Sequence, residues 1–182
     1  MTSALGLDRP GLIGHSLGGF VVASFAARFG AATVISLDQT FELSQLAAAV
    51  QPFSRTILDG RGVDLYLEMS EQQGLGALPP AWREQLLQTR RQLDGAVIAG
   101  VWGRLLKNDR HELDALVSGA LSNLDAPLLS LHWYDVPSGY ETWLRSLIRG
   151  AQLEVWNGAE HFCHVRDPDR VANRVLEHLH SL

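Results

Sequence analysis

Residues 10–30, PGLIGHSLGGFVVASFAARFG, decide the fold of this 182-residue chain. A short apolar run over residues 10–14 is typical of a buried parallel strand. The apolar segment over residues 17–29 predicts a helix that stops at Gly30. Because this helix is apolar on almost every side, we expect most of its faces to be buried. Residues 32–37 regain strand character, so the stretch predicts a strand–helix–strand unit with a right-handed crossover.

The composition is that of an ordinary globular chain, with 46% hydrophobic residues, 19% charged residues and a net charge of −5. The arginines are scattered, so nothing favours a nucleic-acid partner. The single cysteine excludes an internal disulfide, and the histidine spacing indicates neither a metal nor a cofactor. No apolar stretch approaches the roughly 18–20 residues that span a bilayer, and residues 1–11 do not resemble a secretory signal. We therefore expect a cytoplasmic protein without a membrane partner.

The middle of the chain, residues 41–123, predicts several helices and no convincing strand. Amphipathic periodicity is clear over residues 81–93 and 110–121. The residues expected on the inward faces of these two helices are Trp82, Leu86, Leu87, Leu93, Leu113, Leu116, Val117 and Leu121. Because the flanking segments have an α/β pattern, we predict three parts: a core over residues 1–40, a helical insertion over 41–123 and a second core segment over 124–182.

The last third of the chain returns to alternating strands and helices. We expect strands at residues 128–133 and 153–156, with a helix over 139–149 between them. Asp167 followed by Pro168 predicts the start of a final helix. Its expected inward residues are Val171, Val175, Leu176 and Leu179, and its two histidines, His178 and His180, are expected on the surface together with His111.

The chemistry centres on Gly14-His15-Ser16-Leu17-Gly18, a Gly-x-Ser-x-Gly pattern between a predicted strand and a predicted helix. In a nucleophile elbow the serine occupies a strained strand-to-helix turn, and glycines flank it because a Cβ there would clash with nearby backbone. The following helix N-terminus directs N–H groups towards a developing oxyanion. The alternative interpretation is a Gly-rich helix start with an incidental serine. Neither a dinucleotide fingerprint nor a P-loop is present.

A nucleophilic serine needs a base and an orienting carboxylate. Catalytic groups in such sheets lie at the carboxyl ends of strands. Asp135 follows one predicted strand and His161 follows the next, 26 residues later. Asp38 also ends a strand and is a second candidate for the acid.

These segments resemble the α/β-hydrolase-fold family, in the elbow region and in LDAPLLSLHWYDVP through GAEHFCHVRDPDRVANRVLEHL. The resemblance implies an α/β fold with a parallel sheet of about four strands here and a helical cap insertion. It implies that Ser16 is the nucleophile, His161 the general base and Asp135 the orienting acid, in the order expected for this fold. The N–H of Leu17 would be one oxyanion donor, and His15 would shape the same region.

Other residues near these motifs have weaker claims. We expect His164 to pack or hydrogen-bond near the site, and Cys163 to be a small buried hydrophobe. Trp82, Trp102 and Trp133 either line an acyl pocket under the cap or belong to an ordinary core. A serine nucleophile argues against the epoxide-hydrolase and dehalogenase branches, which use aspartate there.

Family members carry strands before the elbow strand, including a loop that supplies a second oxyanion donor. Without them the elbow strand is expected at a sheet edge, apolar and open to a second copy in a homodimer. The predicted function is that of a serine hydrolase, which cleaves an ester or a similar acyl bond in a small-molecule substrate. The alternatives are a truncated or non-catalytic binding protein, a cofactor-free perhydrolase and a carbon–carbon bond hydrolase.

Overall fold

The computed structural model describes residues 6–158 and 160–182 of the chain. Contacts divide the chain into two compact units. Of the described residues, the sheet unit comprises 6–41, 116–158 and 169–182, and the helical unit comprises 42–115 and 160–168. The predicted division into a core and an inserted cap stays a prediction, and each unit is described by itself.

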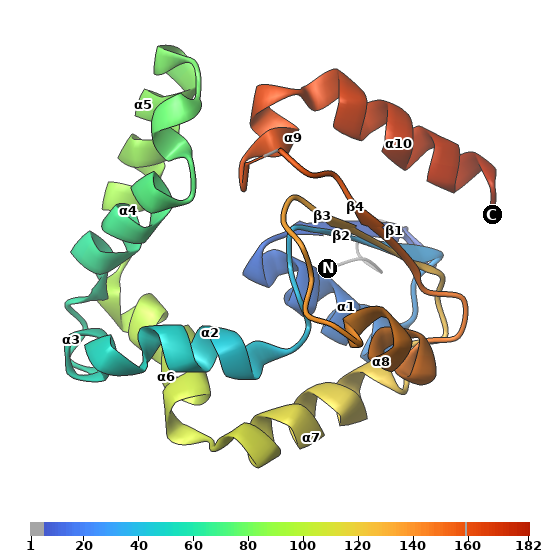
Figure 1. Ribbon diagram of the computed structural model, residues 1–182, viewed down its shortest axis with the longest axis horizontal. Coiled ribbons are helices and arrows are strands. Elements are labelled where there is room, and N and C mark those ends of the chain that lie inside the picture. The colour runs from blue at the N-terminus through green and yellow to red at the C-terminus, as the bar shows by residue number, and fades with distance from the viewer. Residues whose placement is uncertain (1–5, 159) are drawn as a thin grey trace. The chain divides into compact units, whose positions relative to one another are not determined.

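Over its described residues, the sheet unit contains four parallel strands in the order β1-β2-β3-β4 (Figure 1). Their bounds are β1 Gly11–His15, β2 Thr33–Leu37, β3 Leu128–His132 and β4 Gln152–Val155. Every residue of the two central strands is buried, as the uniformly apolar runs predict. The predicted strand–helix–strand unit and the parallel α/β sheet are therefore confirmed.

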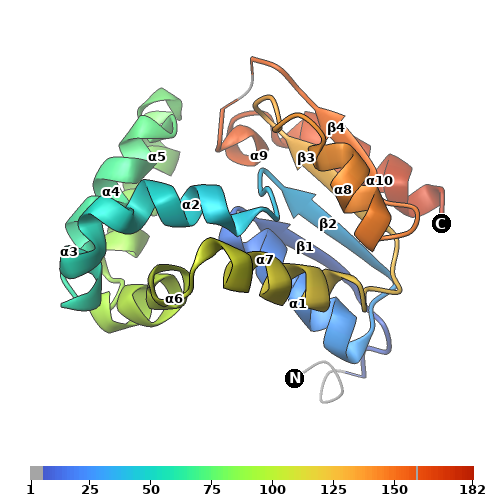
Figure 2. The ribbon, with the colours of Figure 1, turned by 60° about the horizontal axis from the view of Figure 1, so that its bottom comes forward.

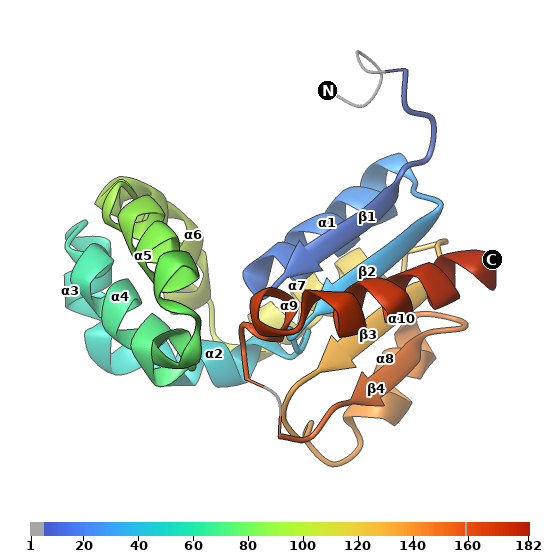
Figure 3. The same ribbon diagram turned by 90° about the horizontal axis from the view of Figure 1, so that it is seen from above.

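Helices cover both faces of this sheet (Figures 1 and 3). One face carries α1 Leu17–Phe29 and α8 Tyr140–Leu147, and the other carries α10 Pro168–His180. On the first face, the Tyr140 hydroxyl accepts a hydrogen bond of 2.9 Å from the Phe41 N–H. On the second face, a hydrogen bond of 2.8 Å joins His178 Nε2 to Thr33 Oγ1. These polar contacts fix both helical layers on the sheet.

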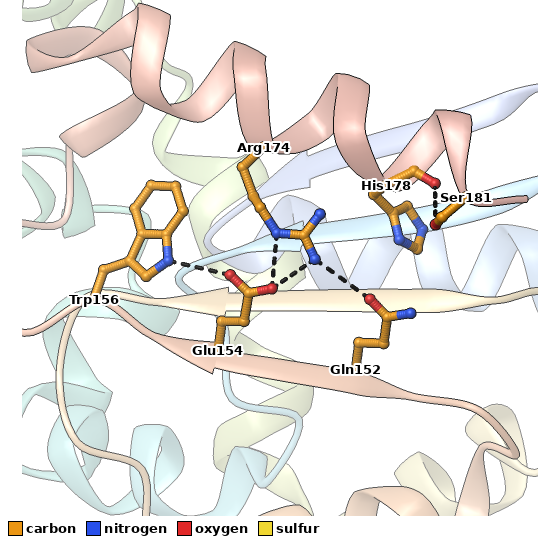
Figure 4. A network of polar contacts seen from close by, with 6 residues as sticks. All are labelled: Gln152, Glu154, Trp156, Arg174, His178 and Ser181. Atoms are coloured by element: carbon orange, nitrogen blue, oxygen red, sulfur yellow. Dashed lines mark hydrogen bonds and ion pairs between the residues drawn. The ribbon is translucent and has the colours of Figure 1, made fainter.

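Helix α10 is bonded to the edge strand β4 through Arg174, whose guanidinium donates two hydrogen bonds, of 2.7 and 2.6 Å, to Glu154 Oε1 (Figure 4). Arg174 also contacts Gln152 at 3.4 Å. The Trp156 indole donates to the other Glu154 oxygen at 3.2 Å. Such charge-assisted bonds are stronger than neutral ones, so they help to hold α10 on β4.

The prediction that His178 lies on the surface was wrong. Its side chain is 1% exposed, because α10 turns it towards the sheet. The Thr33 hydroxyl donates to the Pro127 carbonyl at 2.9 Å and accepts from His178. Burial, with a smaller contribution from Arg174, lowers the pKa of His178. His111 and His180 are exposed as predicted.

The apolar helix α1 is less buried than its composition predicts. Only Gly19, Ala23 and Ala26 are fully buried, whereas Val21 and Phe29 are about 60% exposed. Among the described strands β1 ends the sheet, so the helix above it has a neighbouring strand on one side only. Four further residues expected inside are exposed instead: Trp82, Leu116, Leu176 and Leu179. Periodicity shows which residues share a face, but not how far that face is covered.

The helical unit contains short helices and, over its described residues, no strand (Figure 2). Its α-helices are α2 Leu43–Val50, α3 Ser54–Leu58, α4 Gly62–Gln72, α5 Pro80–Arg91, α6 Gly95–Lys107 and α9 Cys163–Arg166. Two 3₁₀ turns, η2 Gln51–Phe53 and η3 Leu75–Ala77, lie between them, and α7 Arg110–Leu121 crosses into the sheet unit. A capping box starts α7, since Asp109 and Glu112 each accept the other's backbone N–H.

Candidate active site

Ser16 forms the turn between β1 and α1. Its backbone has φ 53° and ψ −136°, a conformation that residues other than glycine rarely adopt. Its N–H donates to the Leu37 carbonyl at 2.8 Å, which ties the turn to the end of β2. The serine side chain makes no capping hydrogen bond to α1. Ser16 is half-buried at the helix N-terminus, and its hydroxyl is not consumed as a cap.

The glycines around Ser16 are needed for close approach, although not all those that the motif suggests. A Cβ on Gly14 would lie 2.1 Å from the Gly18 carbonyl oxygen, so Gly14 is required. A Cβ on Gly18 would meet nothing outside its own helix, which corrects the expectation for that position. Gly19 takes the second role instead, because a Cβ there would lie 2.4 Å from Ser36 Oγ on β2.

Asp38 follows β2 directly and has a second left-handed backbone, with φ 56°. It is 3% exposed and is the only buried carboxylate in the described part of the chain. Its N–H donates to the Leu131 carbonyl at 2.7 Å. Its Oδ1 accepts the Trp133 N–H at 2.9 Å. Asp38 thereby joins the end of β2 to the end of β3.

Asp135 lies in the loop after β3, and its side chain is exposed. Ser16, Asp38 and Asp135 thus all follow the carboxyl ends of strands of the sheet unit. His161 belongs to the helical unit, where it is half-buried with its ring against Phe162, at 5.2 Å between centroids. The assembly of Ser16, His161 and Asp135 into a triad stays a prediction.

The remaining predicted residues lie as follows. His15 ends β1 and Leu17 begins α1, both half-buried, and their roles at an oxyanion stay predictions. Cys163 is buried, as expected for a small hydrophobe, and His164 is half-buried on α9. Trp102 and Trp133 are buried, whereas Trp82 is 52% exposed.

His132, the last residue of β3, was not singled out by the sequence. It is fully buried between Ser130 Oγ, 2.8 Å from its Nε2, and the rings of Tyr134 and Tyr140. Burial lowers the pKa of His132 to about 4, although the nearby Asp38 carboxylate opposes this shift. His132 is therefore neutral at pH 7, and it lies at the carboxyl end of β3.

A second group that the sequence did not reveal is a stack of three side chains. Trp133 and Trp156 follow β3 and β4 and lie 5.0 Å apart between ring centroids. The Arg170 guanidinium on α10 lies 4.1 Å from the centre of the Trp156 ring, a cation–π contact. Trp133 and Trp156 each directly follow a strand, and this shared position in the sequence could have identified the pair. We call these three residues the Trp–Trp–Arg stack.

The described residues contain no group of three or more His, Cys, Asp or Glu side chains that could hold a metal ion. Over the same residues, no helix has the length and apolar character needed to cross a bilayer.

Comparison with known proteins identifies the family. Residues 2–174 match the model of the alpha/beta hydrolase family. The chain belongs to this family. It is 30% identical to the "Putative carbamate hydrolase RutD" of Pantoea ananatis (strain LMG 20103), over 93% of this chain and 63% of that protein. This chain therefore spans less than two thirds of the length of that relative.

Solved alpha/beta hydrolase-like structures agree with the fold. A bromoperoxidase from Bacillus anthracis matches with a TM-score of 0.74 at 15% identity, covering 98% of this chain and 70% of that one. An esterase from Thermogutta terrifontis matches with a TM-score of 0.72 at 20% identity, covering 99% of this chain and 68% of that one. At these identities the likeness shows the fold alone, so the alpha/beta hydrolase's reaction has to be argued from its own residues.

Proposed function

We propose that this alpha/beta hydrolase is a serine hydrolase that cleaves an ester or a similar acyl bond. The observation that carries the proposal is the conformation of Ser16. Its backbone is held at φ 53° between β1 and α1, while its hydroxyl is not consumed as a helix cap. A strained turn of this kind exposes a nucleophile at the carboxyl end of a sheet. The name of the relative, a putative carbamate hydrolase, supports hydrolase chemistry.

In the proposed mechanism, His161 accepts the proton of Ser16 Oγ as the oxygen attacks the substrate carbonyl carbon. The oxyanion that forms accepts a hydrogen bond from the Leu17 N–H at the start of α1, with His15 beside it. His161 then donates the proton to the leaving group, which leaves an acyl group on Ser16. Water, deprotonated by His161, releases the acid and restores the serine. Asp135 orients His161 and stabilises its charged form.

Asp135 is proposed as the acid because its carboxylate is open to a partner in the loop after β3. The rival, Asp38, already accepts the Trp133 N–H. Perhydrolases and carbon–carbon bond hydrolases are the alternatives that share this proposed set of residues, so the assay needs substrates of each class.

The test compares hydrolysis of p-nitrophenyl acetate by the wild type, Ser16→Ala and Ser122→Ala. Ser122 lies on the surface beyond the end of α7 and serves as the matched control. We expect turnover by the wild type and by the control, and none above background by Ser16→Ala. Equal rates for all three proteins would refute the proposed function. Peracid formation from acetate and peroxide, measured alongside, identifies a perhydrolase.

The predicted homodimer through β1 remains a proposal. Ile13 on this strand is 52% exposed, and the strand carries no charged residue that would oppose pairing. Light scattering tests this proposal, because a monomer at high concentration would contradict it.

A further inference from the structure

We propose that Asp38 is a positioning residue, which holds the loops after β3 and β4 through Trp133 and the Trp–Trp–Arg stack. The consequence for catalysis rests on the proposed function, because these two loops lead to Asp135 and His161. The structural link can be tested apart from it.

The first step of the link is the hydrogen bond between Asp38 Oδ1 and the Trp133 N–H, 2.9 Å long. Asp38 is itself held, because its own N–H donates to Leu131 at 2.7 Å. Two bonds therefore connect one residue after β2 to both sides of the β3 terminus. Asp135 is only two residues beyond Trp133, so this anchor fixes the start of the loop that carries it.

The second step leads from Trp133 to the loop after β4. The Trp133 and Trp156 rings lie 5.0 Å apart between centroids, and Arg170 covers the outer face of Trp156. The Trp156 N–H donates to the His132 carbonyl at 2.8 Å, so backbone and side chain both tie Trp156 to β3. His161 lies five residues beyond Trp156. Both loops thus start from tryptophans in mutual contact.

The same geometry includes the serine. The Ser16 N–H donates to Leu37, the residue that immediately precedes Asp38. Hydrogen bonds between neighbouring strand ends, linked by the peptide bonds from Leu37 to Asp38 and from His132 to Trp133, therefore connect Ser16 through Asp38 to Trp156. This connection explains why a buried carboxylate is retained here: it supplies the acceptor for an N–H that β2 backbone does not reach.

This role needs an oxygen acceptor at Asp38 and does not need its negative charge. Asparagine offers the same acceptor and tolerates the left-handed backbone better than most residues do. Alanine removes the acceptor and leaves a buried N–H without its bond. An orienting acid, by contrast, depends on its charge, and the amide analogue fails. Asp38→Asn and Asp38→Ala therefore separate the two roles.

The structural readout is the exciton couplet of the Trp133–Trp156 pair in the circular dichroism spectrum. Trp156→Phe identifies the couplet by abolishing it, and Trp82→Phe, at an exposed position, is the control that leaves it intact. We expect Asp38→Asn to keep the couplet and Asp38→Ala to lose most of it, with both proteins still showing a cooperative unfolding transition. A couplet that survives in Asp38→Ala would overturn the proposal. If Asp38→Ala does not fold, loss of the couplet in folded Asp38→Asn would overturn it equally.

The catalytic readout uses hydrolysis of p-nitrophenyl acetate by the same proteins. We expect Asp38→Asn to keep kcat within about threefold, and Asp38→Ala to lower kcat roughly 10- to 100-fold, as a misplacement of catalytic groups by about 1 Å does. KM should change little, since binding is not the step affected. A kcat for Asp38→Asn as low as that of Ser16→Ala would overturn the positioning role and assign Asp38 as the acid. If the wild type is inactive, the proposed function fails, and the couplet alone decides whether Asp38 holds the loops.

Discussion

The turns after β1 and β2 share a backbone conformation, but their side chains behave differently. Ser16 and Asp38 both have a positive φ, 53° and 56°, and each directly follows a strand of the sheet, β1 or β2. The Ser16 side chain is half-exposed and bonds nothing in α1, whereas the Asp38 side chain is 3% exposed and bonds the Trp133 backbone. A left-handed residue can therefore present a side chain outwards or anchor a neighbouring strand.

This difference teaches how backbone strain is retained at the strand ends. Each left-handed position costs of order 1–3 kcal/mol and persists only where surrounding contacts fix it. At Asp38 the side chain itself supplies such a contact. At Ser16 the fixing contacts come from elsewhere, including the Leu37 carbonyl and the close approach of Gly14 to Gly18. The strain at Ser16 is thus not offset by a bond from its own side chain, as the proposed role of a functional turn predicts.

The largest expected effect is that of Ser16→Ala on turnover. Removing a nucleophile of a triad costs about 10⁶-fold in kcat, which should bring hydrolysis of p-nitrophenyl acetate to background. The free energy of unfolding, measured with urea, should change by less than about 0.5 kcal/mol, because the hydroxyl makes no capping bond. A large loss of stability would show that Ser16, like Asp38, is a structural anchor.

The next largest effect separates the two aspartates. Asp135→Asn should lower kcat by about 10⁴-fold, as loss of an orienting acid does in a serine triad. Its stability should be unaffected, since the side chain is exposed. Full activity in Asp135→Asn would remove Asp135 from the site and leave Asp38 as the candidate acid.

A third effect concerns pH and His132, the buried histidine near Asp38. Its pKa is lowered from 6.5 to about 4, so between these two pH values the unfolded chain binds more protons at this histidine than the folded chain does. The stability contributed by neutral His132 is complete above pH 6.5 and is lost between pH 6.5 and about 4. The loss amounts to about 3 kcal/mol at pH 4.

Urea unfolding at several pH values, for the wild type and His132→Gln, isolates this contribution from that of the carboxylates. The stability of His132→Gln should fall less steeply below pH 6.5. Parallel curves for the two proteins would contradict the lowered pKa. Because the Asp38 carboxylate raises the pKa of His132, Asp38→Asn should lower that pKa further, so that the loss still begins near pH 6.5 but continues to lower pH and becomes larger.

The smallest effects come from glycine at the two left-handed positions. Ser16→Gly relieves strain without removing a side-chain bond and should raise the free energy of unfolding by about 1 kcal/mol. Asp38→Gly relieves similar strain but leaves the Trp133 N–H unsatisfied, which costs about 1–3 kcal/mol, so its net effect should be a loss. Thermal or urea unfolding measures the sign of the change in the free energy of unfolding for each variant. Two changes of the same sign would mean that the two turns are not used differently.

The sequence predicted the strand and helix succession because short apolar runs and glycine stops are local signals. The turn at Ser16 was also predictable, since its motif lies between two such signals, whereas the role of Ser16 as a nucleophile stays a prediction. Burial was harder to predict: His178 lies inside because Thr33, on a distant strand, offers a hydrogen-bond partner. Val21 and Phe29 are exposed because β1 ends the described sheet. The Trp–Trp–Arg stack escaped prediction because three separate elements have to meet to form it.

The most direct test of the central claim is covalent labelling of Ser16 by a fluorophosphonate probe, followed by intact mass measurement and peptide mapping. The account predicts a single adduct on the peptide that contains Ser16, and no adduct in Ser16→Ala or in heat-unfolded wild type. The control variant Ser122→Ala should be labelled like the wild type. An adduct on another residue, or none on the folded protein, would contradict the assignment of Ser16 as the nucleophile.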